Sequence, residues 1–167
     1  MTLSLAVLND LGRAGFGEAL AKIFEHSPRI PITAYEARPF HSVGELHAAM
    51  VNVVAQSGPD KQLALLRAHP MLAKRAELTE ASRAEQGDMG LDRLDTAEAE
   101  AFDTLNAEYQ ERFGFPFIIA VRGQRDRAAI LAALKSRLTN DAGTERAAAL
   151  AEVAKIARFR LDDLVGS

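Results

Sequence analysis

The amino-acid sequence predicts an all-α protein: a single-domain bundle of about seven to nine helices over residues 1–167, with one short buried extended segment. Three observations lead to this prediction. Ala, Leu, Arg and Glu, which favour helix, are plentiful, and aromatic residues are few. Apolar residues recur at three- and four-residue steps through most of the chain. A length of 167 residues, 48% of them hydrophobic and with no linker or repeat, suits one core.

The first half of the chain is divided into predicted helices by Pro, Gly and Ser residues. Residues 1–9 are apolar but few, and we expect an extended lead-in there. After these residues, runs of apolar residues at helical spacing predict helices. Each run is followed by residues that disfavour helix. These helices span about residues 11–26, 31–38, 43–56 and 60–68. Ser42 is expected to cap the third, because Glu45 follows at the spacing of a capping box.

Further helices are predicted in the second half of the chain. They span about residues 96–113, 126–138 and 144–165. The first is expected to be capped by Asp95 or Thr96, and Gly114 directly after it suits the left-handed conformation that ends many helices. Before them, residues 69–86 show no strong amphipathic pattern, and Gly-Asp-Met-Gly at 87–90 breaks the chain.

The segment 115–121, Phe-Pro-Phe-Ile-Ile-Ala-Val, differs from the helices around it. It is continuously apolar, and it is too short to be predicted as a helix. Pro116 interrupts it and lacks the amide hydrogen that a helix requires. We therefore expect this segment to be extended and buried.

Charge and composition argue against several classes of partner. The formal net charge is −3 and the isoelectric point is about 5.8, so no basic surface for nucleic acid is predicted. No apolar run approaches the roughly 20 residues that a membrane helix needs, so no membrane association is expected. The N-terminus lacks the features of a signal peptide, and the last three residues are not a peroxisomal signal. A cytoplasmic location is therefore expected.

The sequence also lacks the patterns of common metal and cofactor sites. It contains no cysteine, which excludes disulfides, thiolate nucleophiles and cysteine zinc sites. It has no His-Glu-x-x-His pattern, no acidic calcium loop and no Gly-rich phosphate loop. The Gly-x-Ser-x-Gly elbow of many hydrolases is missing as well. We therefore expect no metal and no bound cofactor.

His69 is a candidate for proton transfer. It follows the helix predicted at 60–68 and shares the inward side of its last leucines, and Pro70 disfavours helical backbone at the histidine itself. A histidine that is partly buried at such a break suits general acid–base chemistry. The position equally suits a structural histidine that is hydrogen-bonded at a helix junction. His47, near another apolar face, is the rival candidate, whereas His41 lies in a loop and is expected in solvent.

Ser82, Glu85 and Gln86 form a second group of candidates. Ser82-Arg83-Ala84-Glu85 has the spacing of a capping box, in which the serine caps a helix and the glutamate bonds back to the serine amide. A helix that starts there would also offer amide hydrogens to an anion or a carbonyl oxygen, with Gln86 beside them. A structural cap and a ligand site both explain the pattern.

Arg160 is the most informative charged residue. On the last predicted helix it lies in line with the apolar positions Val153, Ala157 and Leu164. A buried guanidinium is costly unless it is paired with an anion. We therefore expect Arg160 to bind a carboxylate, which is either that of a substrate or that of an internal Asp or Glu.

Several short motifs occur together, and each of them alone is weak. They are Arg-Pro-Phe-x-Ser at 38–42, His-Pro-x-Leu at 69–72, Leu-Thr-x-x-Ser-x-x-Glu-Gln at 78–86, Gly-Leu at 90–91, Leu-Asn-x-x-Tyr at 105–109, Phe-Gly-Phe-Pro-Phe at 113–117 and Lys-Ile-Ala-x-x-Arg-Leu at 155–161. In this order and spacing they are specific: the chain resembles the OHCU decarboxylase family along nearly its whole length. OHCU is 2-oxo-4-hydroxy-4-carboxy-5-ureidoimidazoline.

The resemblance implies a fold, an assembly and a reaction. Members of the family are all-helical, usually homodimeric and independent of cofactors. They catalyse the last step of urate breakdown, in which OHCU is decarboxylated to (S)-allantoin with stereospecific protonation. The expected partner is therefore the small molecule OHCU. The chain departs from the family pattern at Lys74-Arg75 and at Gly87-Asp88-Met89, which we expect to alter loop detail more than chemistry.

The resemblance also implies roles for individual residues. The family's catalytic histidine falls on His69, and its acidic partner falls on Glu85. The residues implied in substrate binding are Pro70, Ser82, Gln86, Phe117, Ile118, Ile119, Ala120, Val121 and Arg160. The last agrees with the helical-face argument, which selects Arg160 rather than Arg158.

The implied chemistry agrees with the missing cofactor motifs. Loss of CO2 from C4 leaves an electron pair that the neighbouring ring C=N can accept, so no pyridoxal, thiamine or metal is required. His69 is then expected to act as the general acid–base, and Glu85 to orient and polarise a substrate nitrogen or the imidazole. Two alternatives stay open. One is a lyase or hydrolase for a related ureido acid, and the other is a helical interaction module in which both residues are structural.

Overall fold

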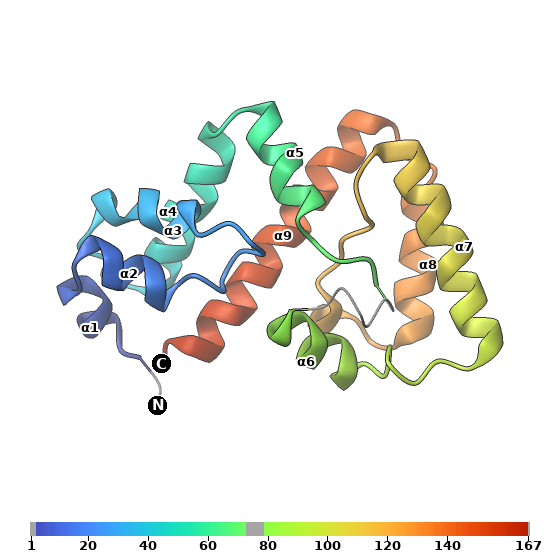
Figure 1. The fold of residues 1–167 in the computed structure, drawn as a ribbon, viewed down its shortest axis with the longest axis horizontal. Helices are drawn as coiled ribbons and strands as arrows, with labels where there is room; N and C mark the ends of the chain where they lie inside the picture. The colour runs from blue at the N-terminus through green and yellow to red at the C-terminus, as the bar shows by residue number, and fades with distance from the viewer. Residues whose placement is uncertain (1–2, 73–78, 167) are drawn as a thin grey trace. The chain divides into compact units, whose positions relative to one another are not determined.

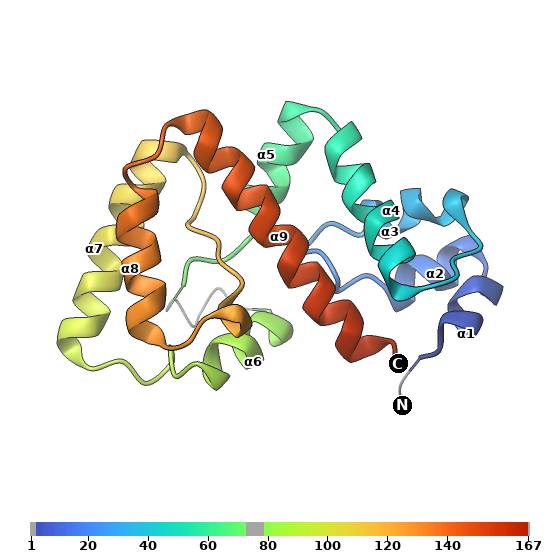
Figure 2. The same ribbon diagram turned by 180° about the vertical axis from the view of Figure 1, so that it is seen from behind.

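The computed structural model describes residues 3–72 and 79–166, and every regular element in those ranges is a helix (Figures 1 and 2). The only extended pairing there is an isolated bridge between Leu3 and Val165. The predicted all-α class is confirmed.

The chain divides into two compact units. Unit 1 comprises Met1–Ala68 and Ala154–Ser167, and unit 2 comprises His69–Val153. Helix α9 (Ala142–Leu164) therefore begins in unit 2 and ends in unit 1. The organisation of residues 1–167 as one domain stays a prediction.

Unit 1 is built from short helices. They are α1 (Leu5–Asp10), α2 (Arg13–Ala19), α3 (Arg29–Ala34), the 3-10 turn η1 (Tyr35–Ala37), α4 (Val43–Gln56) and α5 (Pro59–Arg67). The Ser42 hydroxyl accepts a hydrogen bond from the Glu45 amide at 3.0 Å, so Ser42 caps α4 as predicted. The Glu45 carboxylate, however, accepts from the amide of His41 at 2.8 Å rather than from that of Ser42.

Two predictions for the start of the chain are wrong. The expected extended lead-in forms α1, because the Ser4 hydroxyl caps it by accepting a hydrogen bond from the Val7 amide at 3.2 Å. The helix expected at 11–26 ends at Ala19, and the chain continues through turns. Its large apolar residues at helical spacing are nevertheless buried, namely Phe16, Leu20, Ile23 and Phe24. Their spacing indicated burial correctly, but it could not indicate where the helix ends.

Unit 2 contains α6 (Glu80–Asp88), α7 (Thr96–Phe113), the 3-10 turn η3 (Val121–Gly123), α8 (Arg127–Arg137) and the first part of α9. Asp95 caps α7 through a complete capping box with Glu98. Gly114 ends α7 with a φ of 81°, in the left-handed region where glycine carries no steric cost. Both boundaries were predicted from local signals.

The segment between α7 and η3 is buried, as predicted. Residues 115–120 form no helix, and Ala120 has extended backbone angles, with φ −71° and ψ 98°. Extended structure ends there, because Val121 already belongs to η3. In Figures 1 and 2 the segment runs as an irregular strand-like connection from the end of α7 back toward η3 and α8.

A buried carboxylate joins the helices of unit 2. Glu145 of α9 is 0% exposed, and its Oε1 accepts a hydrogen bond from the Tyr109 hydroxyl of α7 at 2.6 Å. Arg137 at the end of α8 donates to the same oxygen through Nε at 2.5 Å, and Asn140 donates to Oε2 at 3.0 Å. Burial, followed by the hydrogen bond to Glu145, raises the pKa of the Tyr109 phenol far above its usual range.

This raised pKa predicts a loss of stability at alkaline pH. The phenol of an unfolded chain titrates near pH 10, whereas folded Tyr109 retains its proton to higher pH. The contribution of the phenol to the free energy of unfolding is therefore fully present below about pH 10. It is lost as the pH rises above that value, by up to about 1.4 kcal/mol per pH unit. We expect Tyr109→Phe to remove this part of the pH dependence. Urea unfolding at pH 8 to 11 measures the free energy of unfolding of both proteins. An equal decrease of this free energy with pH in the wild type and in the variant would contradict the prediction.

Candidate active site

His69 is the first residue of unit 2, directly after Ala68, the C-terminal cap of α5. It is 7% exposed and is followed by Pro70, so it is buried at a break between helices, as the sequence predicted. Leu72 fixes the same stretch, because its carbonyl accepts a hydrogen bond from the Asn106 side chain of α7 at 3.1 Å. Asn106 is itself buried, and its Oδ1 has no hydrogen-bond partner in the described ranges.

Helix α6 carries Ser82, Glu85 and Gln86, but Ser82 does not cap it. The cap is Thr79, whose hydroxyl accepts a hydrogen bond from the Ser82 amide at 3.2 Å. The predicted capping box is therefore wrong, because a second residue suited to capping lies one turn earlier in the chain. The helix start that was expected to present Ser82 to a ligand lies instead at Thr79 and Glu80.

Because α6 begins before Ser82, Ser82 and Gln86 are interior residues of the helix rather than part of its N-terminus. Both side chains lie inside the helix, four residues apart on one face, and both are buried. Glu85 lies beside them and is half-buried. The same helix packs against η3, which follows the segment predicted to line the pocket. Unit 2 thus brings α6 and the end of the 117–121 segment together.

The backbone of the 117–121 segment is held from two neighbouring helices. The Ile118 carbonyl accepts a hydrogen bond from Arg137 Nη1 of α8 at 2.5 Å. The Ala120 amide donates to the Glu152 carboxylate of α9 at 3.3 Å. Within the described part of the chain, the backbone groups of Phe117 and Ile119 form no hydrogen bond. Buried backbone groups of this kind usually meet a partner, so these suit a ligand.

Arg160 lies in unit 1 and has an internal anion. Its Nη2 lies 2.8 Å from Glu25 Oε1, and its Nη1 donates to the Lys22 carbonyl at 3.2 Å. The predicted burial is confirmed, and so is the alternative in which an internal acid pairs with Arg160. Substrate binding by Arg160 stays a prediction. Arg158 instead forms an exposed pair with Asp162, at 2.9 Å.

The other histidines differ from His69. His47 of α4 is half-buried, and its Nε2 lies 2.8 Å from the Ala154 carbonyl of α9, to which it must donate because a carbonyl only accepts. His41 is exposed, as expected. These positions leave His69 as the buried histidine that lies at a break between helices.

Sequence reasoning missed Arg137, Glu145 and Glu152, and it included Asn106 only as part of the Leu-Asn-x-x-Tyr motif. Glu145 and Glu152 are buried acids on the inward face of α9, the face on which Arg160 lies. The helical-face argument that selected Arg160 could therefore have found them as well. Arg137 and Asn106 left no such signal, because each acts on a backbone carbonyl that is distant in sequence.

Metal-binding side chains and membrane-spanning helices are considered for the described ranges. No group of three or more His, Asp or Glu side chains gathers there in a way that could hold a metal ion. Each helix in those ranges is too short or too polar to reach across a bilayer. Lys74-Arg75, one of the two departures from the family pattern, lies outside the described residues.

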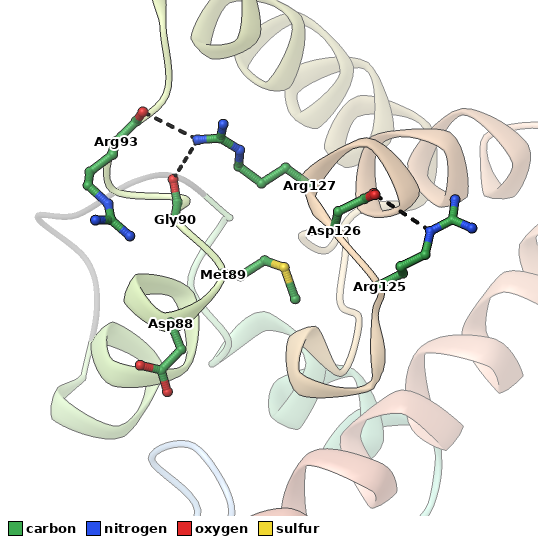
Figure 3. Close-up of a pocket in the computed structure, with 7 residues that line it drawn as sticks. All are labelled: Asp88, Met89, Gly90, Arg93, Arg125, Asp126 and Arg127. Carbon is green, nitrogen blue, oxygen red and sulfur yellow. Dashed lines mark hydrogen bonds and ion pairs between the residues drawn. The ribbon is translucent and has the colours of Figure 1, made fainter.

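A pocket of about 540 Å³ lies between the end of α6 and the start of α8 (Figure 3). It is lined by Asp88, Met89, Gly90, Arg93, Arg125, Asp126 and Arg127. Arg127 Nη1 donates to the carbonyls of Gly90 and Arg93, at 3.1 and 3.3 Å. Figure 3 shows these bonds tying the turn after α6 to α8. Arg127 therefore stabilises this turn, and none of the predicted site residues lines the pocket.

Comparison with known proteins gives consistent matches. A family model described as OHCU decarboxylase matches residues 9–162. The chain is 44% identical to a 2-oxo-4-hydroxy-4-carboxy-5-ureidoimidazoline decarboxylase of Haloferax volcanii, over 99% of this chain and 98% of that protein.

Two solved structures are similar as well. A crystal structure of (S)-allantoin synthase matches with a TM-score of 0.80 and 30% identity, over 98% of this chain and 54% of that one. A crystal structure of OHCU decarboxylase in the presence of (S)-allantoin matches with a TM-score of 0.68 over 83% of this chain and 91% of that one. The second is 24% identical and supports the fold alone.

The buried pair of Arg160 and Glu25 predicts a large effect on stability. Glu25→Ala leaves the guanidinium buried without its carboxylate, and breaking such a pair costs about 3–5 kcal/mol of unfolding free energy. Asp162→Ala is the control on the same helix, because its pair with Arg158 is exposed and is expected to contribute at most about 1 kcal/mol. Urea unfolding at neutral pH measures both. A loss for Glu25→Ala no greater than that for the control would contradict the prediction.

Proposed function

Because the chain belongs to the OHCU decarboxylase family, we propose that it decarboxylates OHCU to (S)-allantoin, the last step of urate degradation to allantoin. The observation that carries this proposal is the family match, which covers residues 9–162 and therefore all of the predicted site residues. The full-length similarity to the Haloferax volcanii decarboxylase supports the same reaction. The chain is then a carboxy-lyase whose substrate is a small molecule.

The reaction needs few chemical steps from the protein. The bond between C4 and the carboxylate breaks, CO2 leaves, and the electron pair moves into the ring as the neighbouring C=N accepts electrons at nitrogen. The nitrogen takes up a proton, a second proton is added to one face of the adjacent ring carbon, and the C4 hydroxyl loses its proton to become a carbonyl. The substrate provides its own electron sink. The protein must bind the carboxylate, orient the ring and manage the protons.

His69 is the proposed general acid–base. Its burial beside Pro70, at the junction after α5, supports this role, because an imidazole held away from bulk water can exchange a proton with a bound substrate. Glu85 is proposed to orient and polarise a substrate nitrogen or the imidazole. Its half-buried position in α6, next to the buried Gln86, supports this role.

The remaining predicted residues bind the substrate in this proposal. The amide of Gln86 and the hydroxyl of Ser82 suit the polar groups of the ureido chain and the ring. The backbone of residues 117–121 holds ring and ureido amides. This assignment is supported by the backbone groups of Phe117 and Ile119, which form no hydrogen bond within the described part of the chain. Pro70 bounds the site, and Arg160 fixes a polar end of the substrate. A homodimer and a cytoplasmic location complete the proposal.

The test generates OHCU from urate with urate oxidase and hydroxyisourate hydrolase. We expect the protein to accelerate the decay of OHCU absorbance and to give optically active allantoin, because the spontaneous reaction gives the racemate. His69→Ala should lower turnover by about 10²–10⁴-fold, the usual contribution of a general acid–base. His41→Ala is the control, because that histidine is exposed, and should retain turnover.

The outcomes separate the proposal from its alternatives. Wild-type protein that changes neither the rate nor the chirality would contradict the proposed function and favour a different ureido substrate or an interaction module. An active wild type with a fully active His69→Ala variant would contradict only the role of His69.

A further inference from the structure

The 117–121 segment is held by charged side chains that the reaction itself does not require. Arg137 donates to the Ile118 carbonyl at 2.5 Å, and its guanidinium lies over the Phe117 ring, 4.5 Å from the ring centroid. Glu152 accepts from the Ala120 amide at 3.3 Å. Two side chains from two different helices therefore bind the backbone of one short segment.

The hydrogen bonds from Arg137 and Glu152 reach every second residue of the segment, Ile118 and Ala120. In an extended chain the N–H and C=O of one residue point to one edge, and those of the next residue point to the opposite edge. Ile118 and Ala120 share one edge, and both are bound there by helix side chains. Phe117 and Ile119 then share the opposite edge, where their backbone groups form no hydrogen bond with the described residues. One edge of the segment is anchored by side chains, and the backbone groups of the other edge have no hydrogen-bond partner among the described residues.

Arg137 is itself fixed before any ligand binds. Its Nε donates to Glu145 Oε1 at 2.5 Å, and Glu145 also accepts from Tyr109. Arg137 Nη2 lies 2.5 Å from the same oxygen as an ion pair, but it forms no hydrogen bond within the described ranges. The Tyr109 ring in turn lies edge-on to Phe117, with 5.4 Å between the centroids. The Nε bond to this buried carboxylate and the Nη1 bond to the Ile118 carbonyl together hold the guanidinium between Glu145 and the segment.

We propose that Arg137 is a positioning residue for the decarboxylation: by clamping the Ile118 carbonyl, it holds the Phe117 and Ile119 backbone edge toward the substrate. This inference rests on the proposed function. Arg137 touches no reacting atom, and it acts only through the segment.

The proposal gives Arg137 a kinetic effect that a purely structural residue would lack. A loosened segment leaves the acid–base groups intact, but it lets the ring turn relative to the proton donor. We therefore expect a lower kcat and a lower enantiomeric excess of allantoin, as well as a higher KM. A misplacement of about 1 Å in a site can lower the rate by about 100-fold.

The test uses Arg137→Met combined with Glu145→Gln. The double substitution removes a buried charge pair as a pair, which is often nearly neutral for stability, and it leaves Tyr109 a hydrogen-bonding partner. We expect thermal unfolding near that of the wild type and a kcat/KM that is lower by about 10- to 100-fold. Arg137→Lys should recover part of kcat, because lysine keeps the charge but lacks the planar fork that contacts Glu145 and Ile118 together.

Arg112→Met is the matched control. Arg112 also donates to a backbone carbonyl, that of Asn140 at 3.0 Å, and also lies over a phenylalanine ring, that of Phe113 at 5.3 Å, but it does not touch the segment. We expect its kcat, KM and enantiomeric excess to equal those of the wild type. Enantiomeric excess is compared at enzyme concentrations where the spontaneous reaction is a small part of the total.

The results distinguish this inference from the proposed function. Inactive wild-type protein contradicts the function. An active wild type, together with a folded double variant that has wild-type kcat, KM and enantiomeric excess, overturns the role of Arg137 alone. Equal losses in the double variant and in Arg112→Met overturn it as well, because the effect would then not depend on the segment.

Discussion

The Glu145 carboxylate is the interaction on which the rest of unit 2 depends. It is fully buried, so it must be matched by donors, and these come from Tyr109 of α7, from Arg137 of α8 and from Asn140 in the turn before α9. One ion thus fixes three helices and the guanidinium that reaches the Ile118 carbonyl. The stability of the unit and the position of the proposed substrate-binding backbone have the same physical origin.

The residues of the proposed site are positioned by different kinds of local structure. His69 is placed by a break between helices, and Glu85 and Gln86 are placed by the regular turns of α6, which Thr79 caps. The 117–121 segment has no regular structure to place it, so side chains from α8 and α9 hold its backbone instead. A decarboxylation in which the substrate accepts the electron pair requires orientation above all, and such anchoring provides orientation.

Much of the fold could be predicted because its signals are local. The cap at Asp95, the left-handed Gly114 and the buried segment after it follow from adjacent residues. Ser82 failed as a cap because Thr79, one turn earlier, competes for the same role, and spacing alone cannot rank them. The candidate site was found through the family motifs and the helical-face argument. An internal acid could be expected for Arg160, but its identity as Glu25 could not be predicted, since the two residues are 135 residues apart.

The most direct measurement follows backbone amide resonances during titration with (S)-allantoin, the proposed product. We expect saturable shifts at the amides of Phe117 and Ile119, together with shifts at His69, because the proposed site lies along that edge of the segment. Unchanged amides at Phe117 and Ile119, with shifts confined to the pocket around Arg93 and Arg125, would contradict the account.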